Sequence, residues 1–114
     1  MSKNTIKIAN CSGFYGDRLS AAKEMVDGGP IDVLTGDYLA ELTMAILYGQ
    51  KIQRGEKAGY VGTFLKQLKQ IASSCSEKNI KVVSNAGGLN PKSMADEVKN
   101  ILDSEGLNLK VAYI

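Results

Sequence analysis

The chain has no histidine and no tryptophan, and only two cysteines and two prolines among its 114 residues. Histidine is the commonest general base, the usual partner of a serine or cysteine nucleophile, and the commonest ligand of transition metals. Any chemistry must therefore use carboxylates, lysines, hydroxyls, amides or the backbone. Cys11 and Cys75 show neither CxxC spacing nor the density of a disulfide scaffold. We expect both cysteines to be reduced.

Long apolar runs are also absent. Stretches such as TMAILY at 43–48 fall far short of the roughly 20 residues of a membrane-spanning helix, and the first residues, MSKNTIKIAN, lack a secretory apolar region. We expect a cytoplasmic protein that contacts no membrane. The chain carries four basic and six acidic residues up to Gln50, and ten basic and six acidic residues after it. This asymmetry is too weak to predict nucleic-acid binding.

Short apolar runs alternate with segments of helical spacing along the whole chain. The order βαβαβαβ predicts one α/β domain over 1–114, with an open parallel sheet of about four strands covered by helices on both faces as three layers. Such a fold is Rossmann-like or flavodoxin-like, and half of a (βα) barrel is the alternative. The predicted strands are 5–9, 31–34, 80–83 and 107–114, and the predicted helices begin near Asp17, Asp37, Val61 and Asn90.

The second predicted helix is apolar on nearly every side. Between Tyr38 and Tyr48 only Glu41 and Thr43 are polar. We expect this helix to be covered on more than one face, either at the centre of the fold or in an interface.

Glycines and small polar residues follow the first three predicted strands. In parallel α/β folds ligands bind at this edge, where helix N-termini present N–H groups. Neither the GxGxxG nor the GxxxxGK[ST] pattern is present, so nucleotide binding has only the fold in its favour. The alternative is ordinary turns, with glycine at positive φ and asparagine capping a helix. The candidate substrate-binding residues are Asn10, Ser12, Gly13, Asp17, Arg18, Asn85, Gly87, Gly88 and Asn90.

Asp37 and Glu41 are the candidate catalytic residues. They are four residues apart and would share one face of a helix that starts near Asp37. A carboxylate on an apolar helix needs a partner or a proton, which suits a general acid or base. The alternative is that Asp37 caps the helix and Glu41 pairs with a lysine or arginine. Arg18 would hold an anion. We assign no residue to a metal, and the sequence identifies no cofactor.

Three stretches carry a family resemblance: IANCSGFYGDR, GDYLAELTMAIL and VVSNAGGLNPKSMADEV. In this order and spacing, from about Ile8 to Ile114, the chain resembles the N-terminal part of the acyclic terpene utilization AtuA family. The resemblance implies a role beside the degradation of acyclic terpenes such as citronellol and geraniol, or in related branched acyl-CoA metabolism. It also implies that the domain continues beyond Ile114, because family domains are longer.

We therefore predict an AtuA-like protein that binds a small anionic acyl substrate at the carboxyl ends of the strands, with Asp37 or Glu41 as acid or base. One alternative is a non-catalytic module whose helix 38–48 docks on a partner subunit, a second copy or the remainder of a longer chain. The other alternative is a nucleotide-binding α/β module.

Overall fold

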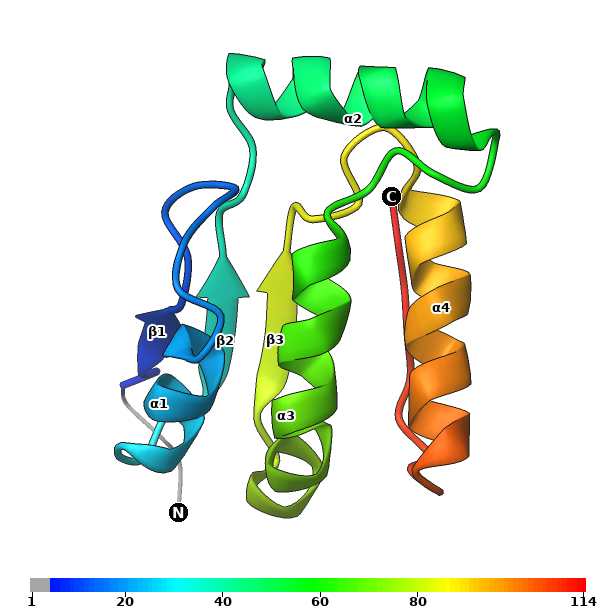
Figure 1. Ribbon diagram of the computed structural model, residues 1–114. Helices are drawn as coiled ribbons and strands as arrows, with labels where there is room; N and C mark the ends of the chain where they lie inside the picture. Colours follow the sequence, from blue (N-terminus) through cyan, green and yellow to red (C-terminus); the bar gives the residue numbers. More distant parts are fainter. Residues whose placement is uncertain (1–4) are drawn as a thin grey trace.

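The fold belongs to the predicted α/β class. The computed structural model describes residues 5–114, and it places short strands and longer helices in alternation (Figure 1). The elements are β1 (Ile8–Asn10), α1 (Ala21–Asp27), β2 (Val33–Gly36), α2 (Glu41–Arg54), α3 (Gly62–Lys78), β3 (Lys81–Ser84) and α4 (Pro91–Ser104).

The sheet is open and parallel, with the strand order β1-β2-β3. When strands follow one another in chain order, right-handed crossovers put the connecting helices on one face. Both α1 and α3 do pack against the face that carries Leu34. The other face leaves Ile8 and Val83 more than half exposed. Within residues 5–114 helices therefore cover one face rather than the expected two, and α2 lies across the carboxyl ends of the strands (Figure 1).

The predicted fourth strand at 107–114 is wrong. This segment runs beside α4 in Figure 1 and pairs with no strand in the described part of the chain. Its alternation still shows which side chains point inward, because Leu107, Leu109 and Val111 pack against the main core. Apolar alternation thus predicts burial of one side, whereas a strand also requires a hydrogen-bonded neighbour.

Two helix starts are later than predicted. The first helix begins at Ala21 rather than near Asp17, and the second begins at Glu41 rather than near Asp37. Before α1, the Asp17 carboxylate accepts the N–H of Gly13, and before α2, the Tyr38 N–H donates to the side chain of Asn85. These hydrogen bonds hold both segments out of the helical conformation. The start of α4 is confirmed, because Asn90 Oδ1 accepts a hydrogen bond of 3.2 Å from Ser93 N–H.

Tyr38 lies at the centre of the core and is 1% exposed. Its ring packs edge-on against Phe64 with centroids 6.1 Å apart. Its hydroxyl donates to Gln67 Oε1 and lies 3.8 Å from Cys11 Sγ. Burial raises the pKa of the Tyr38 hydroxyl, which therefore stays protonated.

Both cysteines are buried and free, as expected. Burial is also the main cause that raises the pKa of each thiol. Cys11 and Cys75 are therefore held as protonated, weakly reactive core residues.

The ring of Tyr38 leaves no room for a side chain at Gly36. A Cβ built on Gly36 would lie 2.5 Å from Tyr38 Cε2. We expect Gly36→Ala to lower the free energy of unfolding by about 1–3 kcal/mol, as overpacking does. In a Tyr38→Leu background the same change should cost less, because the ring is gone. Denaturant unfolding of the four chains measures this coupling.

Gly49→Ala is the matched control. Gly49 lies inside α2, and no atom lies within 4 Å of the position that an added methyl group would take, so alanine should stabilise the chain by about 0.5–1 kcal/mol. Equal costs at positions 36 and 49, or a cost at Gly36 that does not change without the Tyr38 ring, would contradict this packing.

Candidate functional site

The structure brings several predicted site residues together at the carboxyl ends of the strands. Asn10 Oδ1 accepts from Thr35 Oγ1 at 3.1 Å, and Asn10 Nδ2 donates to the Ser12 carbonyl at 2.8 Å. The same carbonyl accepts the Asp37 N–H at 3.0 Å. We call the edge formed by Asn10, Ser12, Asp37 and Asn85 the rim. Its members from β1 and β2 are joined by direct hydrogen bonds.

Asn85 connects the end of β3 to the other two strands. Its Oδ1 accepts from Tyr38 N–H at 2.8 Å, and its Nδ2 donates to Asp37 Oδ1 at 2.7 Å. An amide fits here because one atom must accept while the other donates. Asp37 is exposed, and its Oδ2 has no partner within residues 5–114. The rim thus holds one carboxylate oxygen and leaves the other open.

Asp17 organises the loop after β1 and lies before the start of α1. Its two carboxylate oxygens accept the N–H groups of Gly13 and Arg18, each at 2.9 Å. These bonds are the main cause that lowers the pKa of Asp17. The N–H of Gly13, one of the predicted substrate-binding residues, is therefore occupied by a carboxylate of the chain itself.

Arg18 does not reach the rim in this structure. Its guanidinium forms a fork with Glu24, with Nε–Oε2 at 3.0 Å and Nη2–Oε1 at 3.1 Å. Both side chains are more than half exposed, so the pair is worth at most about 1 kcal/mol. The arginine predicted to hold an anion is paired with a carboxylate of α1.

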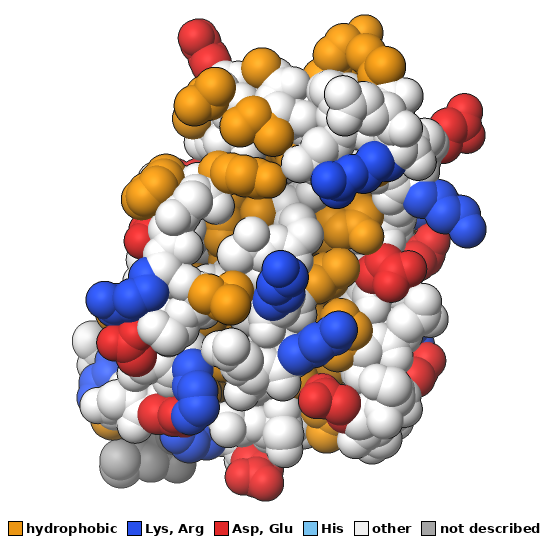
Figure 2. Space-filling view, viewed as in Figure 1, with side chains coloured by type: hydrophobic (Ala, Val, Ile, Leu, Met, Phe, Trp, Pro, Cys, Tyr) orange, Lys and Arg blue, Asp and Glu red, His pale blue; other side chains and the backbone are white. Residues whose placement is uncertain are grey.

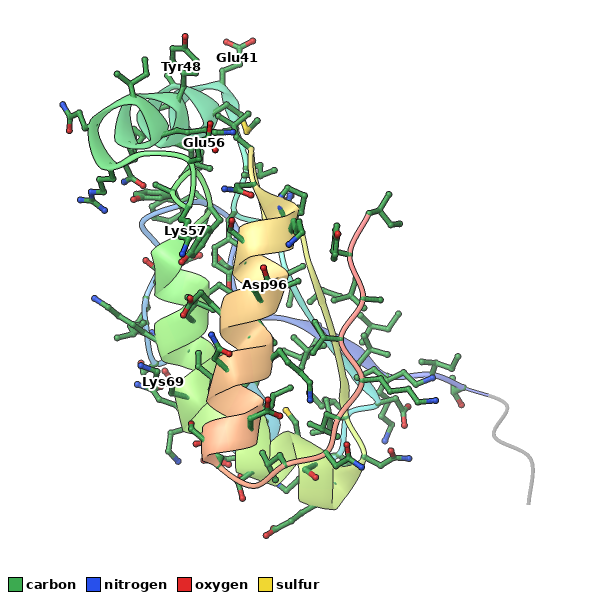
Figure 3. The ribbon with its side chains drawn as sticks, turned by 90° about the vertical axis from the view of Figure 1, so that its right-hand side faces the viewer. Glu41, Tyr48, Glu56, Lys57, Lys69 and Asp96 are labelled. Atoms are coloured by element: carbon green, nitrogen blue, oxygen red, sulfur yellow. The ribbon has the colours of Figure 1, made fainter. Side chains whose placement is uncertain are left out.

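Glu41 and Asp37 do not share a helix face, contrary to the prediction. Asp37 precedes α2, whose N-cap is Ala40, so Asp37 does not cap the helix either. Glu41 is exposed and projects from α2 away from the rest of the molecule (Figure 3). The structure therefore separates the two predicted catalytic carboxylates.

The residues at the end of the β3–α4 turn have structural roles. Gly88 has φ +55°, and a Cβ there would clash with Leu47 Cδ1. Asn90 caps α4 and also donates from Nδ2 to the carbonyl of Ala58 at 2.9 Å. Gly87 faces a separate apolar groove along β3. Gly88 and Asn90 thus join the turn to its neighbours instead of extending the rim.

The structure also reveals a basic pocket that the sequence did not predict. It is a hollow of about 540 Å³ between the end of α2 and the start of α3, lined by Arg54, Lys57 and Lys66 and by no carboxylate. Figure 3 shows Lys57 between these two helices. Tyr15 lines it too, and its hydroxyl accepts from Gln50 Nε2 at 3.3 Å. Tyr15 belongs to the same loop as Ser12, so this loop contributes one residue to the rim and one to the basic pocket.

Metal binding has no evident site in the described part of the chain, where no group of three or more cysteine or acidic side chains is placed to hold an ion. From residue 5 onward, no helix has both the length and the apolar run needed to cross a bilayer.

The bonds to Asp17 predict a pH-dependent contribution to stability. Because the folded-state pKa is lowered, the ionised carboxylate stabilises the fold at pH 7, and this contribution is lost as pH falls below about 4, through the folded-state pKa. Asp17→Asn should therefore differ most from the parent chain near neutral pH. Unfolding curves from pH 7 to pH 2 and an NMR titration of Asp17 test this. A midpoint at the ordinary value, or a difference independent of pH, would contradict it.

Comparison with known proteins gives one match. The family model described as acyclic terpene utilisation family protein AtuA matches residues 6–114. No curated protein and no solved structure matches the chain significantly. The family model covers nearly the whole chain and includes every residue of the rim and of the basic pocket. The chain therefore belongs to the AtuA family.

Proposed function

We propose that this chain acts in the cytoplasmic breakdown of acyclic terpenes by binding a small anionic acyl compound across the rim and the basic pocket. Family membership supports the pathway. The observation that carries the binding proposal is the basic pocket, where three cationic side chains meet no carboxylate. Since Arg18 is paired with Glu24, these cations are the better partners for the anionic group.

The basic pocket favours an anion for two reasons. Arg54, Lys57 and Lys66 place like charges around one hollow, and a bound anion would offset their repulsion. The pocket also includes Gly62 and Thr63 in the first turn of α3, where N–H groups lack helical partners and the dipole is positive. Its volume of about 540 Å³ lies in the usual range for small-molecule sites.

Asp37 is the group that we propose to contact the reacting end of the ligand. Asn85 fixes one carboxylate oxygen, and the other faces solvent at the rim, so it can take up or deliver a proton. Glu41 is not part of this proposal because its side chain points away from the rim (Figure 3). A CoA thioester with a short branched acyl chain fits both parts of this proposal. Its phosphates would supply the anionic group for the basic pocket, and its acyl group would supply the reacting end at Asp37.

Charge reversal in the basic pocket tests the binding proposal. We expect Lys57→Glu with Lys66→Glu to weaken binding of a branched acyl-CoA by roughly tenfold or more, because two attractions become repulsions. Lys69→Glu is the matched control, since Lys69 is exposed on the same helix as Lys66 but lies outside the pocket (Figure 3). Calorimetric titration measures all three chains.

The two carboxylates complete the test. Asp37→Asn should change affinity for the acyl thioester but not for free coenzyme A, whereas Glu41→Gln should change neither. No measurable binding of acyl-CoA by the parent chain, or equal losses in the pocket variant and in Lys69→Glu, would contradict the proposal.

A second candidate function is docking on another subunit through α2. This helix is buried only on the side of Thr43 and Leu47, not on several sides as expected. Leu42, Tyr48 and Ile52 are 72%, 61% and 67% exposed on its other side. Figure 2 shows hydrophobic side chains along the top of the molecule, where α2 lies, and Figure 3 shows Tyr48 projecting outward. An exposed apolar stripe of this kind favours an interface.

Docking between copies through α2 predicts concentration-dependent sedimentation of the purified chain. Leu42→Lys with Ile52→Lys should abolish the association without lowering the unfolding temperature, because both side chains are exposed. A parent chain that sediments as a monomer at every concentration, and that captures no second subunit, would rule this function out.

A further inference from the structure

The basic pocket contains two aromatic side chains as well as its three cations. Tyr15 and Tyr60 both line it, and both are half-buried. They come from different parts of the fold, because Tyr15 lies in the loop after β1 and Tyr60 lies just before α3. A simple anion would account for the cations but would leave the two rings without a role.

Tyr60 stands on backbone that is fixed on both of its sides. The carbonyl of Gly59 accepts the N–H of Leu89 at 2.9 Å, and the N–H of Val61 donates to the carbonyl of Ala86 at 2.8 Å. Both bonds tie this loop to the turn between β3 and α4. Tyr60 is therefore placed at the pocket before a ligand arrives, which lowers the entropic cost of binding.

Tyr15 is held in two ways. It packs against the main core, and its hydroxyl accepts from Gln50 Nε2 at 3.3 Å. The hydroxyl of Tyr15 is thus already engaged, so the ring is what it offers to a ligand. Burial, followed by the charge of Glu97, raises the pKa of Tyr60, whose hydroxyl therefore stays protonated and adds no negative charge beside the cations.

The charge and size of the pocket favour a ligand with more than one phosphate group. Three cationic side chains line it without a carboxylate. A carboxylate brings one negative charge, whereas a phosphate monoester carries roughly 1.5–2 at neutral pH, so two phosphates match three cations better. The volume of about 540 Å³ also leaves room beyond a single phosphate group.

The two tyrosines favour an aromatic base on the same ligand. Flat bases stack on aromatic side chains, and this stacking adds affinity whichever base is present. A nucleoside that carries two phosphates combines the base with the charge. Such a group occurs as a free nucleotide and as the nucleotide end of an acyl thioester.

We propose that the basic pocket binds the phosphorylated nucleoside end of the acyl compound, with the three cations on its phosphates and the two tyrosines against its aromatic base. This inference rests on the proposed function and deepens it. It separates the nucleoside end from the glycine-containing strand ends, where the sequence predicted ligand binding. The pocket would then select a nucleotide-linked thioester over the corresponding free acid.

Two bisphosphates of similar charge test this selection on the full chain. Adenosine 3′,5′-bisphosphate has the base and the phosphates without an acyl chain, and fructose 1,6-bisphosphate has two phosphates without a base. In calorimetric titrations we expect the adenosine probe to bind at least about tenfold more tightly, because only its base can stack. Lys57→Glu with Lys66→Glu should weaken both probes, since both present phosphates.

Tyrosine variants test the rings directly. Tyr60→Leu should reduce the preference for the adenosine probe at least about threefold and leave the sugar probe unchanged. Tyr60→Phe retains the ring and should retain the preference. Tyr48→Leu is the matched control, because Tyr48 is exposed on α2 and lies outside the pocket (Figure 3). Thermal unfolding of each variant shows that it is folded.

The outcomes separate this inference from the proposed function. Equal affinity of the parent chain for the two bisphosphates, or equal losses in Tyr60→Leu and Tyr48→Leu, would overturn the inference, even where acyl-CoA binding still depends on Lys57 and Lys66. An adenosine probe that does not compete with a branched acyl-CoA would also overturn it, by assigning the pocket to a free nucleotide. Tyrosine-dependent binding and competition, with no effect of Asp37→Asn on the acyl thioester, would support the nucleoside site and contradict the proposed role of Asp37.

Discussion

The buried side chain of Tyr38 is the interaction on which the arrangement of the strand ends depends. Its ring fills the space above Gly36 on β2, its hydroxyl donates to Gln67 on α3, and Cys11 after β1 lies against it. Asn85 after β3 accepts its backbone N–H. One residue between β2 and α2 therefore contacts the segments that follow β1 and β3 as well. Burying a large aromatic side chain with a satisfied hydroxyl both stabilises the core and fixes where these loops lie.

The rim follows from this placement. Asp37 is the residue before Tyr38, so burial of the Tyr38 ring fixes the position of Asp37. The Asp37 carboxylate then accepts from Asn85, and the Asp37 N–H donates to the Ser12 carbonyl. A carboxylate held by one oxygen on a rigid loop is already oriented before any ligand arrives, which lowers the entropic cost of binding.

Local sequence patterns predicted the α/β class, the first three strands, the cap at Asn90 and the inward side of residues 107–114. They failed where distant groups decide. The amide of Asn85 binds backbone 47 residues away, and this contact keeps Tyr38 out of the helix. Asp17 accepts N–H groups of its own loop, although the local sequence around it predicts the start of a helix. The basic pocket could not be predicted for the same reason, because Arg54 and Lys66 come together only when the C-terminal end of α2 lies near the start of α3. The carboxyl-end position of Asp37 and Asn85 was predictable, since it follows from parallel strands alone.

A preformed rim has a direct signature in amide hydrogen exchange of the unliganded chain. The N–H groups of Asp37 and Tyr38 lie in a loop, yet both are bonded, to Ser12 and to Asn85. They should exchange at least about 100-fold more slowly than the same amides in an unstructured peptide, and Tyr38→Leu should remove this protection from both. Exchange of both amides at the unstructured rate in the parent chain would contradict the claim that Tyr38 builds the rim before a ligand binds.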